Sequence, residues 1–171
     1  RLENRCTYLF DSEEVLRRYD DGLGHFDAIS NQTLCVHEDP GPALWRVARG
    51  WIGTPYVLGG RSDSRMDCSG LTSRACRVAF RAILPKHSTD QLRCGRRVGR
   101  GALASGHFLF ARLGKTNIPH VGVVLDGRDG LDVLHASQRL GEVVREPLDQ
   151  FLQGYRFMGG REIFTGEKAC S

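Results

Sequence analysis

The 171-residue chain has no CxxC pair, no apolar run near membrane-spanning length, no internal repeat and no low-complexity tract. The missing CxxC pair argues against a zinc ribbon or a thioredoxin-type motif. A membrane-spanning helix needs about 20 consecutive apolar residues, so we expect no membrane span. What the chain does have is an apolar content of 40%, which is enough for the core of one compact domain.

The chain also lacks an initial Met and the charged-then-apolar pattern of a secretory signal, since it begins with Arg1. We interpret it as a processed or excised piece whose targeting segment is already absent. The compartment therefore has to be inferred from the chemistry of the site rather than from a leader.

Charge is unevenly distributed along the chain although the net charge is only +4. Residues 1–40 carry 4 basic and 9 acidic side chains, whereas residues 41–112 carry 13 basic and 3 acidic ones. A basic surface attracts an anionic partner, such as a nucleic acid or a polymer with free carboxylates. Four arginines at 93–100 have no interleaved aromatic residues, so the stacking pattern of single-strand binding is missing. We therefore expect no nucleic acid partner. The alternative to an anionic partner of any kind is that these arginines lie in a solvated basic loop.

Two regions are predicted along the chain, an N-terminal extension at 1–40 and a single domain at 41–171. A capping box at Asp11–Glu14 predicts a short helix within the extension. Apolar residues at helical spacing predict one helix at Pro42–Trp51 and a second that starts at Cys68 and is ended by Pro85.

After Gly101 the apolar period changes from helical spacing to the spacing of strands. The predicted strands are His107–Phe110, Ile118–Leu125, Leu131–His135, Gly141–Arg145, Arg156–Met158 and Glu162–Phe164, with a short helix at Pro147–Gln153. Helices followed by a run of antiparallel strands indicate an α+β fold, with helices packed on a central antiparallel β-sheet.

Cys68 is the candidate nucleophile, because it opens the second predicted helix. Unpaired N–H groups at a helix start favour thiolate over thiol, so we expect the pKa of Cys68 to lie below the usual value of about 8.5. The backbone N–H of Cys68 is the candidate donor to an oxyanion. The alternative for a lone cysteine at a helix start is a structural role, which we expect for Cys76.

Two histidines follow on predicted strands, His120 in an apolar run and His135 on the next strand of a hairpin. A polar ring in an apolar strand needs a buried partner or a chemical task. We expect His120 to be the base, and His135 to be a cross-strand neighbour that fixes its tautomer. The alternatives are two satisfied core histidines, or a metal site with Cys68 whose spacing matches no known ligand rule. We therefore expect no metal and no cofactor.

Five sequence blocks, spanning roughly residues 43–164, resemble the NlpC/P60 family of cysteine peptidases. In chain order they are Gly53-Thr-Pro-Tyr56-Val-Leu-Gly-Gly60, Asp67-Cys68-Ser69-Gly70-Leu71, Leu84-Pro85-Lys-His-Ser88-Thr-Asp-Gln91, His120-Val-Gly-Val123 and Leu134-His135-Ala136. The second block matches the nucleophile motif of the family without change. Two positions depart from the pattern: Leu58 replaces the usual Trp, and His107 replaces the usual Asp.

The resemblance implies a papain-like core in which Cys68 is the nucleophile, His120 the base and His135 the orienter. It also implies a substrate pocket whose lining suits an ammonium group, because carboxylate and hydroxyl oxygens accept its hydrogen bonds. The implied pocket residues are Tyr56, Asp67, Ser69 and Ser88.

The same resemblance implies a cysteine peptidase of peptidoglycan stem peptides, which cleaves between γ-D-glutamate and a diamino acid through a thioester on Cys68. The expected partners are peptidoglycan or muropeptides, and an inhibitor protein if the enzyme is an antibacterial toxin. We expect a monomer in the periplasm, in the cell envelope or secreted. Two alternatives stay open: a thiol amidase or acyltransferase on a non-wall substrate, suggested by Leu58 and His107, and a non-catalytic wall-binding module.

Overall fold

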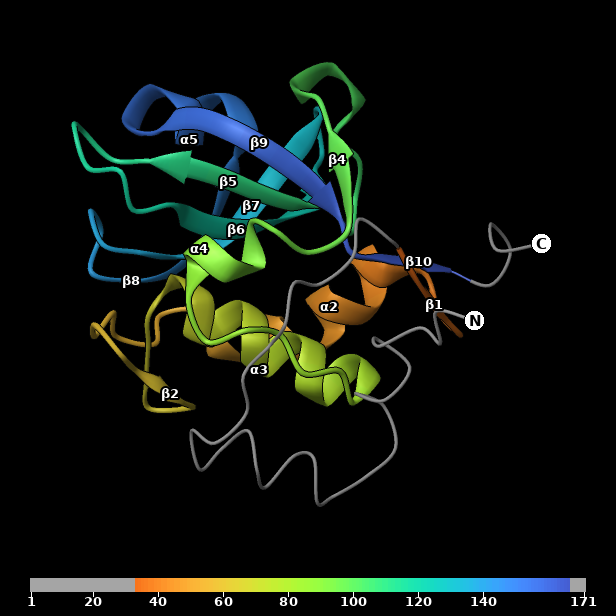
Figure 1. Ribbon diagram of the computed structural model, residues 1–171. Coiled ribbons are helices and arrows are strands. Elements are labelled where there is room, and N and C mark those ends of the chain that lie inside the picture. The colour runs from red at the N-terminus through yellow and green to blue at the C-terminus, as the bar shows by residue number, and fades with distance from the viewer. Residues whose placement is uncertain (1–32, 167–171) are drawn as a thin grey trace.

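A central six-stranded antiparallel sheet forms the body of the computed structural model, which describes residues 33–166 (Figure 1). The strand order across the sheet is β4-β9-β5-β6-β7-β8. The strands are β4 (Arg96–Val98), β5 (Phe108–Arg112), β6 (His120–Asp126), β7 (Leu131–Ser137), β8 (Glu142–Pro147) and β9 (Arg156–Glu162). Strands β5 to β8 form a meander, and β9 returns to lie between β4 and β5. The predicted α+β fold with a central antiparallel sheet is confirmed.

Helices cover both faces of this sheet. They are α2 (Pro40–Ala48), α3 (Cys68–Phe80), α4 (Ser88–Gln91) and α5 (Leu148–Gly154). Two 3-10 turns, at Arg49–Trp51 and Arg100–Ala102, and a small hairpin of β2 (Arg61–Ser62) and β3 (Arg65–Met66) complete the connections. No helix within residues 33–166 is long and apolar enough to cross a membrane.

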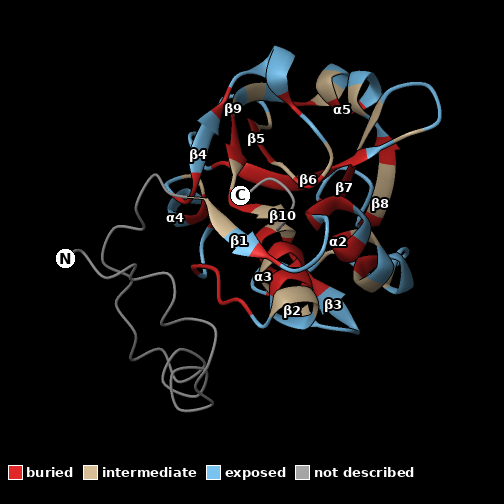
Figure 2. Ribbon diagram, turned by 90° about the vertical axis from the view of Figure 1, so that its right-hand side faces the viewer, coloured by how far each residue is buried: buried red, intermediate tan, exposed pale blue. Residues whose placement is uncertain are grey.

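The alternation of strand side chains divides the interior into two cores. Phe108 and Phe110 of β5 join the core against α2 and α3, whereas Leu109 and Ala111 join the core against Phe151 of α5. Buried residues run along β5, β6 and β7 and continue into α2 and α3 (Figure 2). Both faces of the central strands are therefore closed to water.

The ends of α2 and α3 are set by side-chain caps that the sequence only partly signals. Helix α2 starts at Pro40 rather than Pro42, because Asp39 accepts a hydrogen bond from the backbone N–H of Gly41 at 3.3 Å. Helix α3 starts at Cys68 as predicted but ends at Phe80, well before Pro85. Arg81 adopts the left-handed conformation with φ of 55° and caps the helix there.

Two of the strands lie in segments for which no strand was predicted. Strand β1 (Leu34–Val36) pairs in parallel with β10 (Phe164–Gly166), so the last residues of the predicted extension pack on the domain. Strand β4 pairs with β9, which corrects the alternative of a basic loop for this segment. Its arginines are exposed while Val98 is buried. The helix predicted at Asp11–Glu14 lies outside the described residues.

Candidate active site

Cys68 is the first residue of α3, and its N-cap neighbour Asp67 shapes the loop around it. Oδ1 of Asp67 accepts the N–H of Gly70 at 2.7 Å, and Oδ2 accepts the N–H of Gly59 at 2.7 Å. Gly70 is required for this close packing, because a Cβ there would lie 2.1 Å from the carbonyl oxygen of Gly60. The helix start is thereby pinned against the Gly59-Gly60 turn with the thiol facing a cavity.

A cavity of about 630 Å³ brings Cys68 and His120 into one site. The four predicted pocket residues, Tyr56, Asp67, Ser69 and Ser88, all line it. The lining also includes polar residues that were not assigned a role from the sequence, among them His87, Thr116, Gln138 and Tyr155. His135 does not line the cavity and lies behind His120.

The two histidines are in direct contact on the face of the sheet that α5 covers. Nε2 of His120 and Nδ1 of His135 are 2.8 Å apart, and their rings meet edge to face at 88°. They are diagonal rather than directly opposite, because Val123 pairs with Leu134 across β6 and β7. The contact occupies Nε2 of His120 and leaves its Nδ1 as the nitrogen that remains for chemistry.

Aromatic rings of α5 and of the residue that follows it hold this histidine pair. The ring of Tyr155 stacks on His120 with centroids 4.6 Å apart, and Phe151 stacks on Tyr155 at 4.5 Å. Phe151 also meets the edge of the His135 ring at 4.9 Å. Tyr155 was missed from the sequence, where it appears as one aromatic residue after a short helix. Only the return of β9 beside β5 brings it under His120.

A buried carboxylate extends the pair further from the cavity. Oε1 of Glu146, on β8, lies 2.8 Å from Nε2 of His135. Its other carboxylate oxygen lies 3.4 Å from Nη2 of Arg139. Glu146 was also missed. In the sequence it is one of three charged residues of β8, with Glu142 and Arg145, and no local pattern distinguishes it from them.

The electrostatics of the site differ from the sequence-based expectation for Cys68. Burial raises the pKa of the Cys68 thiol to about 11, although the backbone N–H groups of Val121, Ser69 and Cys68 act in the opposite direction. The predicted lowering of this pKa is therefore wrong. Burial and the neighbouring His135 lower the pKa of His120 to about 3. The free site thus holds a neutral thiol beside a neutral imidazole.

We expect the free energy of unfolding to be largest between about pH 7 and 8.5. The pKa of His135 is also lowered to about 3 by burial, so both histidines take up protons near pH 6.5 only when the chain unfolds. Stability should fall as the pH decreases from about 6.5 towards 3. The Cys68 pKa of about 11 has the opposite effect, so stability should also fall as the pH rises above about 8.5.

Urea unfolding at several pH values tests this dependence in the parent protein and in a His120→Gln variant. The variant should lose part of the decrease below about pH 6.5, because one buried histidine is gone. Parallel profiles for the two proteins across that range would contradict the lowered pKa of His120 as a cause of the pH dependence.

Gln91 fastens the short helix that carries Ser88 to α3. Its Nε2 donates to the carbonyl oxygens of Pro85 at 2.9 Å and Ser69 at 3.3 Å, and its Oε1 accepts from Thr72 Oγ1 at 2.7 Å. The side chain is fully buried. In the sequence, Gln91 stands out only as the last residue of a block that resembles the family. The structure shows that its side chain joins the Ser88 helix to α3 through buried hydrogen bonds.

We expect Gln91→Leu to lower the free energy of unfolding by about 3 kcal/mol, because several buried groups lose their partners. Urea unfolding measures the change. Asp90→Asn, at the exposed neighbouring position, serves as the control and should change stability by less than about 0.5 kcal/mol. A loss below about 1 kcal/mol in Gln91→Leu would show that water replaces the network.

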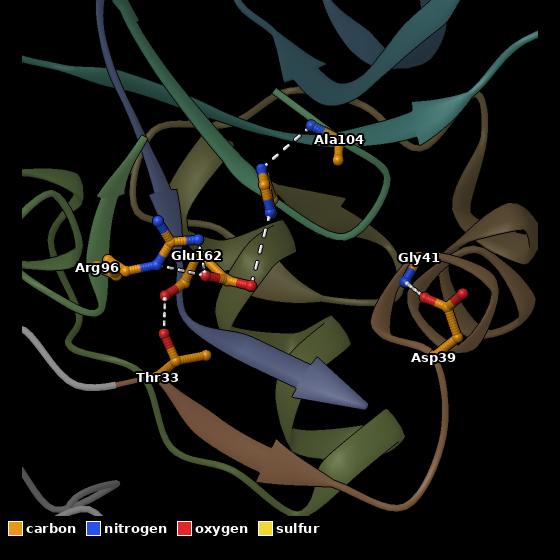
Figure 3. A network of polar contacts seen from close by, with 7 residues as sticks. Thr33, Asp39, Gly41, Arg96, Ala104 and Glu162 are labelled. Carbon is orange, nitrogen blue, oxygen red and sulfur yellow. Dashed lines mark hydrogen bonds and ion pairs between the residues drawn. The ribbon is translucent and has the colours of Figure 1, made fainter. Parts of the chain in front are cut away.

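The two departures from the family pattern lie in different places. Leu58 lines the cavity and is 85% exposed, so it forms part of the rim of the cavity that holds Cys68. His107 is outside that cavity: its Nδ1 accepts the N–H of Ala104 at 3.1 Å, and its Nε2 lies 3.9 Å from Oε1 of Glu162. Figure 3 shows Arg96 bonded to the carboxylate of Glu162 and Thr33 bonded to its backbone carbonyl oxygen. His107 thus orders its own loop at a distance from Cys68.

Cys68 and the two histidines are the residues that the sequence offers as candidate metal ligands. Within residues 33–166, no group of three or more His, Cys, Asp or Glu side chains is arranged to hold a metal ion. Three of the four ring nitrogens of His120 and His135 contact each other or Glu146, and Nδ1 of His120 is the fourth.

Comparison with known proteins finds relatives that match about half of the chain. The chain is 33% identical over 94 residues to Murein DD-endopeptidase MepS/Murein LD-carboxypeptidase of Escherichia coli strain K12, a match that covers 55% of the chain and 48% of the relative. It is 35% identical over 93 residues to Gamma-DL-glutamyl hydrolase of Bacillus subtilis strain 168, covering 52% of the chain and 22% of the relative. The chain therefore spans about half or less of the length of these relatives.

A solved structure and a family model identify the family of the chain. The NlpC/p60 domain of the peptidoglycan hydrolase SagA superimposes with a TM-score of 0.59 and 26% identity, over 71% of the chain and 97% of that domain. The model of the NlpC/P60 family matches residues 53–162, which include Cys68, His120 and His135. From its papain-like α+β fold and this match, we conclude that the chain belongs to the NlpC/P60 family.

Proposed function

We propose that the protein is a cysteine peptidase that hydrolyses the peptide stems of peptidoglycan. The observation that carries this proposal is the joint position of Cys68 and His120 in one cavity, with His120 held at 2.8 Å by His135. A thiol, a base and a group that orients the base are what nucleophilic hydrolysis of an amide requires. The names of the relatives support peptidoglycan as the substrate class.

The neutral state of the thiol and the imidazole determines the first step. Nδ1 of His120 accepts the Cys68 proton as the sulfur attacks the substrate carbonyl carbon, so proton transfer and bond formation are coupled. The backbone N–H of Cys68 stabilises the resulting oxyanion. His120 then gives the proton to the leaving amine, the C–N bond breaks and a thioester on Cys68 remains.

Water completes the cycle at the same base. His120 removes a proton from a water molecule that attacks the thioester carbonyl carbon, and the C–S bond breaks. The proton returns to the Cys68 sulfur and the free carboxylic acid leaves. The enzyme is restored with one water molecule consumed for each amide bond that is cleaved.

The bond that we propose is the one between γ-D-glutamate and a diamino acid. The pocket residues support recognition of a substrate amine near Cys68. Asp67 is a buried carboxylate, and the hydroxyl of Ser69 donates to it at 3.2 Å, so both side chains offer oxygen atoms to an ammonium group. The names of the relatives refer to more than one type of bond. The Bacillus subtilis relative is named for a γ-glutamyl bond, and the Escherichia coli relative is named for DD and LD bonds.

Digestion of defined muropeptides by the purified chain, followed by mass spectrometry, tests both levels of the proposal. We expect new carboxyl ends at D-glutamate and new amine ends at the diamino acid. Cleavage only between two stems would keep the peptidase and reject the bond. Intact muropeptides, together with hydrolysis of a non-wall amide, would favour a thiol amidase or acyltransferase instead.

We further propose that the protein acts outside the cytoplasm, in the periplasm, the cell envelope or the medium. Peptidoglycan is found there, and Cys35 is disulfide-bonded, a state that persists in oxidising compartments. Fractionation of the producing cells tests the location. Recovery of the active protein only from the reducing cytosol would contradict it.

A further inference from the structure

Glu146 is a buried carboxylate that the mechanism above does not use. Its residue is 5% exposed, and it lies on the same face of the sheet as His120 and His135, on the strand next to that of His135. The chain of contacts runs from Glu146 Oε1 to His135 Nε2 at 2.8 Å, and from His135 Nδ1 to His120 Nε2 at 2.8 Å. This chain ends at the cavity that holds Cys68.

The hydrogen-bonding capacity of each member allows only two arrangements. A neutral imidazole has one donor nitrogen and one acceptor nitrogen, and an ionised carboxylate only accepts. If Glu146 is ionised, Nε2–H of His135 must donate to it, and Nδ1 of His135 must then accept from Nε2–H of His120. Nδ1 of His120 is left without a proton. A donor at position 146 would reverse both histidines and put a proton on Nδ1 of His120.

We propose that Glu146 is a positioning residue that fixes the proton on Nε2 of both histidines and so keeps Nδ1 of His120 free to accept the Cys68 proton. The inference rests on the proposed role of His120 as the base. It adds a carboxylate two links away from the nucleophile's partner, at a position no motif of the family resemblance includes.

The contacts of Glu146 support its ionised form, because its two carboxylate oxygens face two nitrogen partners, Nε2 of His135 at 2.8 Å and Nη2 of Arg139 at 3.4 Å. Burial raises the pKa of this carboxyl group overall, and the guanidinium of Arg139 acts in the opposite direction. His135, Arg139 and the hydroxyl of Tyr155 are the titratable groups that act on it or are acted on by it. The contact with Arg139 is stronger for the ionised carboxylate than for the neutral acid, because the hydrogen bond is then charge-assisted on both sides.

The tautomers of the histidines give a readout that needs no substrate. We expect ¹⁵N NMR of the imidazole nitrogens in the full chain to show His120 and His135 protonated on Nε2 and bare on Nδ1. In Glu146→Gln, Arg139 should take the amide oxygen, and the amide NH₂ should donate to His135. Both protons should then move to Nδ1, and kcat should fall about 100-fold with little change in KM.

Glu142→Gln is the matched control, because Glu142 is an exposed glutamate on the same strand. It should leave the tautomers and kcat unchanged. A parent protein with the His120 proton on Nδ1, or a folded Glu146→Gln variant with unchanged tautomers and kcat, would overturn the inference. The expected tautomers in a protein that cleaves no muropeptide would reject the proposed function while the role of Glu146 in fixing the protons stands.

Discussion

Cys68→Ala is expected to lower the rate of stem-peptide hydrolysis by about 10⁴-fold or more. The sulfur is the only atom that forms the covalent intermediate, so His120 has no nucleophile to deprotonate in its absence. The fold should remain, because Cys68 is only partly buried and its backbone keeps its place at the start of α3. Release of amine from a defined muropeptide measures the loss.

Cys76→Ala is the matched control for this variant. Cys76 is a free, fully buried cysteine in the same helix, packed in the core against the sheet. Its truncation should leave kcat unchanged and lower the free energy of unfolding by about 1–2 kcal/mol, as removal of a small buried group does. Hydrolysis by Cys68→Ala at the parent rate would reject the mechanism.

His120→Ala is expected to lower kcat by about 10³-fold at pH 7, the second-largest effect in the account. The reason is the neutral thiol: burial raises the pKa of Cys68 to about 11, so little thiolate exists at pH 7 without a base. The residual rate should therefore rise about tenfold per pH unit as the pH approaches 11, because solvent alone then removes the proton. The parent enzyme should lack this steep rise.

His107→Asp is the control for His120→Ala, since it restores the residue usual in the family at a position outside the cavity. Its kcat should match the parent value. Two results would count against His120 as the base: a loss below tenfold in His120→Ala, or a flat pH profile for its residual rate.

Local sequence patterns predicted the elements that carry Cys68 and the histidines. Apolar residues at helical spacing placed the start of α3 at Cys68, and the structure adds that Asp67 is its N-cap. The strands that hold His120 and His135 are runs of apolar residues separated by a glycine-rich turn, and both lie within two residues of their predicted bounds. Such features depend on neighbours in sequence.

Features that depend on distant partners were not predictable. Strand β1 exists because it pairs with β10 at the other end of the chain, and β4 because it pairs with β9. Arg81 ends α3 in a conformation that usually calls for glycine, so no signal marked it. Glu146 and Tyr155 reach the histidines only through the sheet order, which the sequence leaves open.

The direction of the Cys68 pKa shift was predicted wrongly for the same reason: a local feature was visible in the sequence and a long-range one was not. The field of a helix start is local, and it led to a prediction of a lowered pKa. Burial is a property of the whole fold, and it outweighs the backbone N–H groups around the thiol. As a consequence, Cys68 and His120 are both neutral in the free site and do not form a thiolate–imidazolium ion pair.

Capture of the acyl-enzyme tests covalent catalysis at Cys68 most directly. Turnover of a defined stem peptide is quenched in acid for protein mass spectrometry, and a parallel reaction contains hydroxylamine. We predict an adduct on the Cys68 peptide with the mass of the acyl half of the substrate, and a hydroxamate of that half in the parallel reaction. Full turnover that yields only the free acid, with no adduct on Cys68 and no hydroxamate, would contradict covalent catalysis at Cys68.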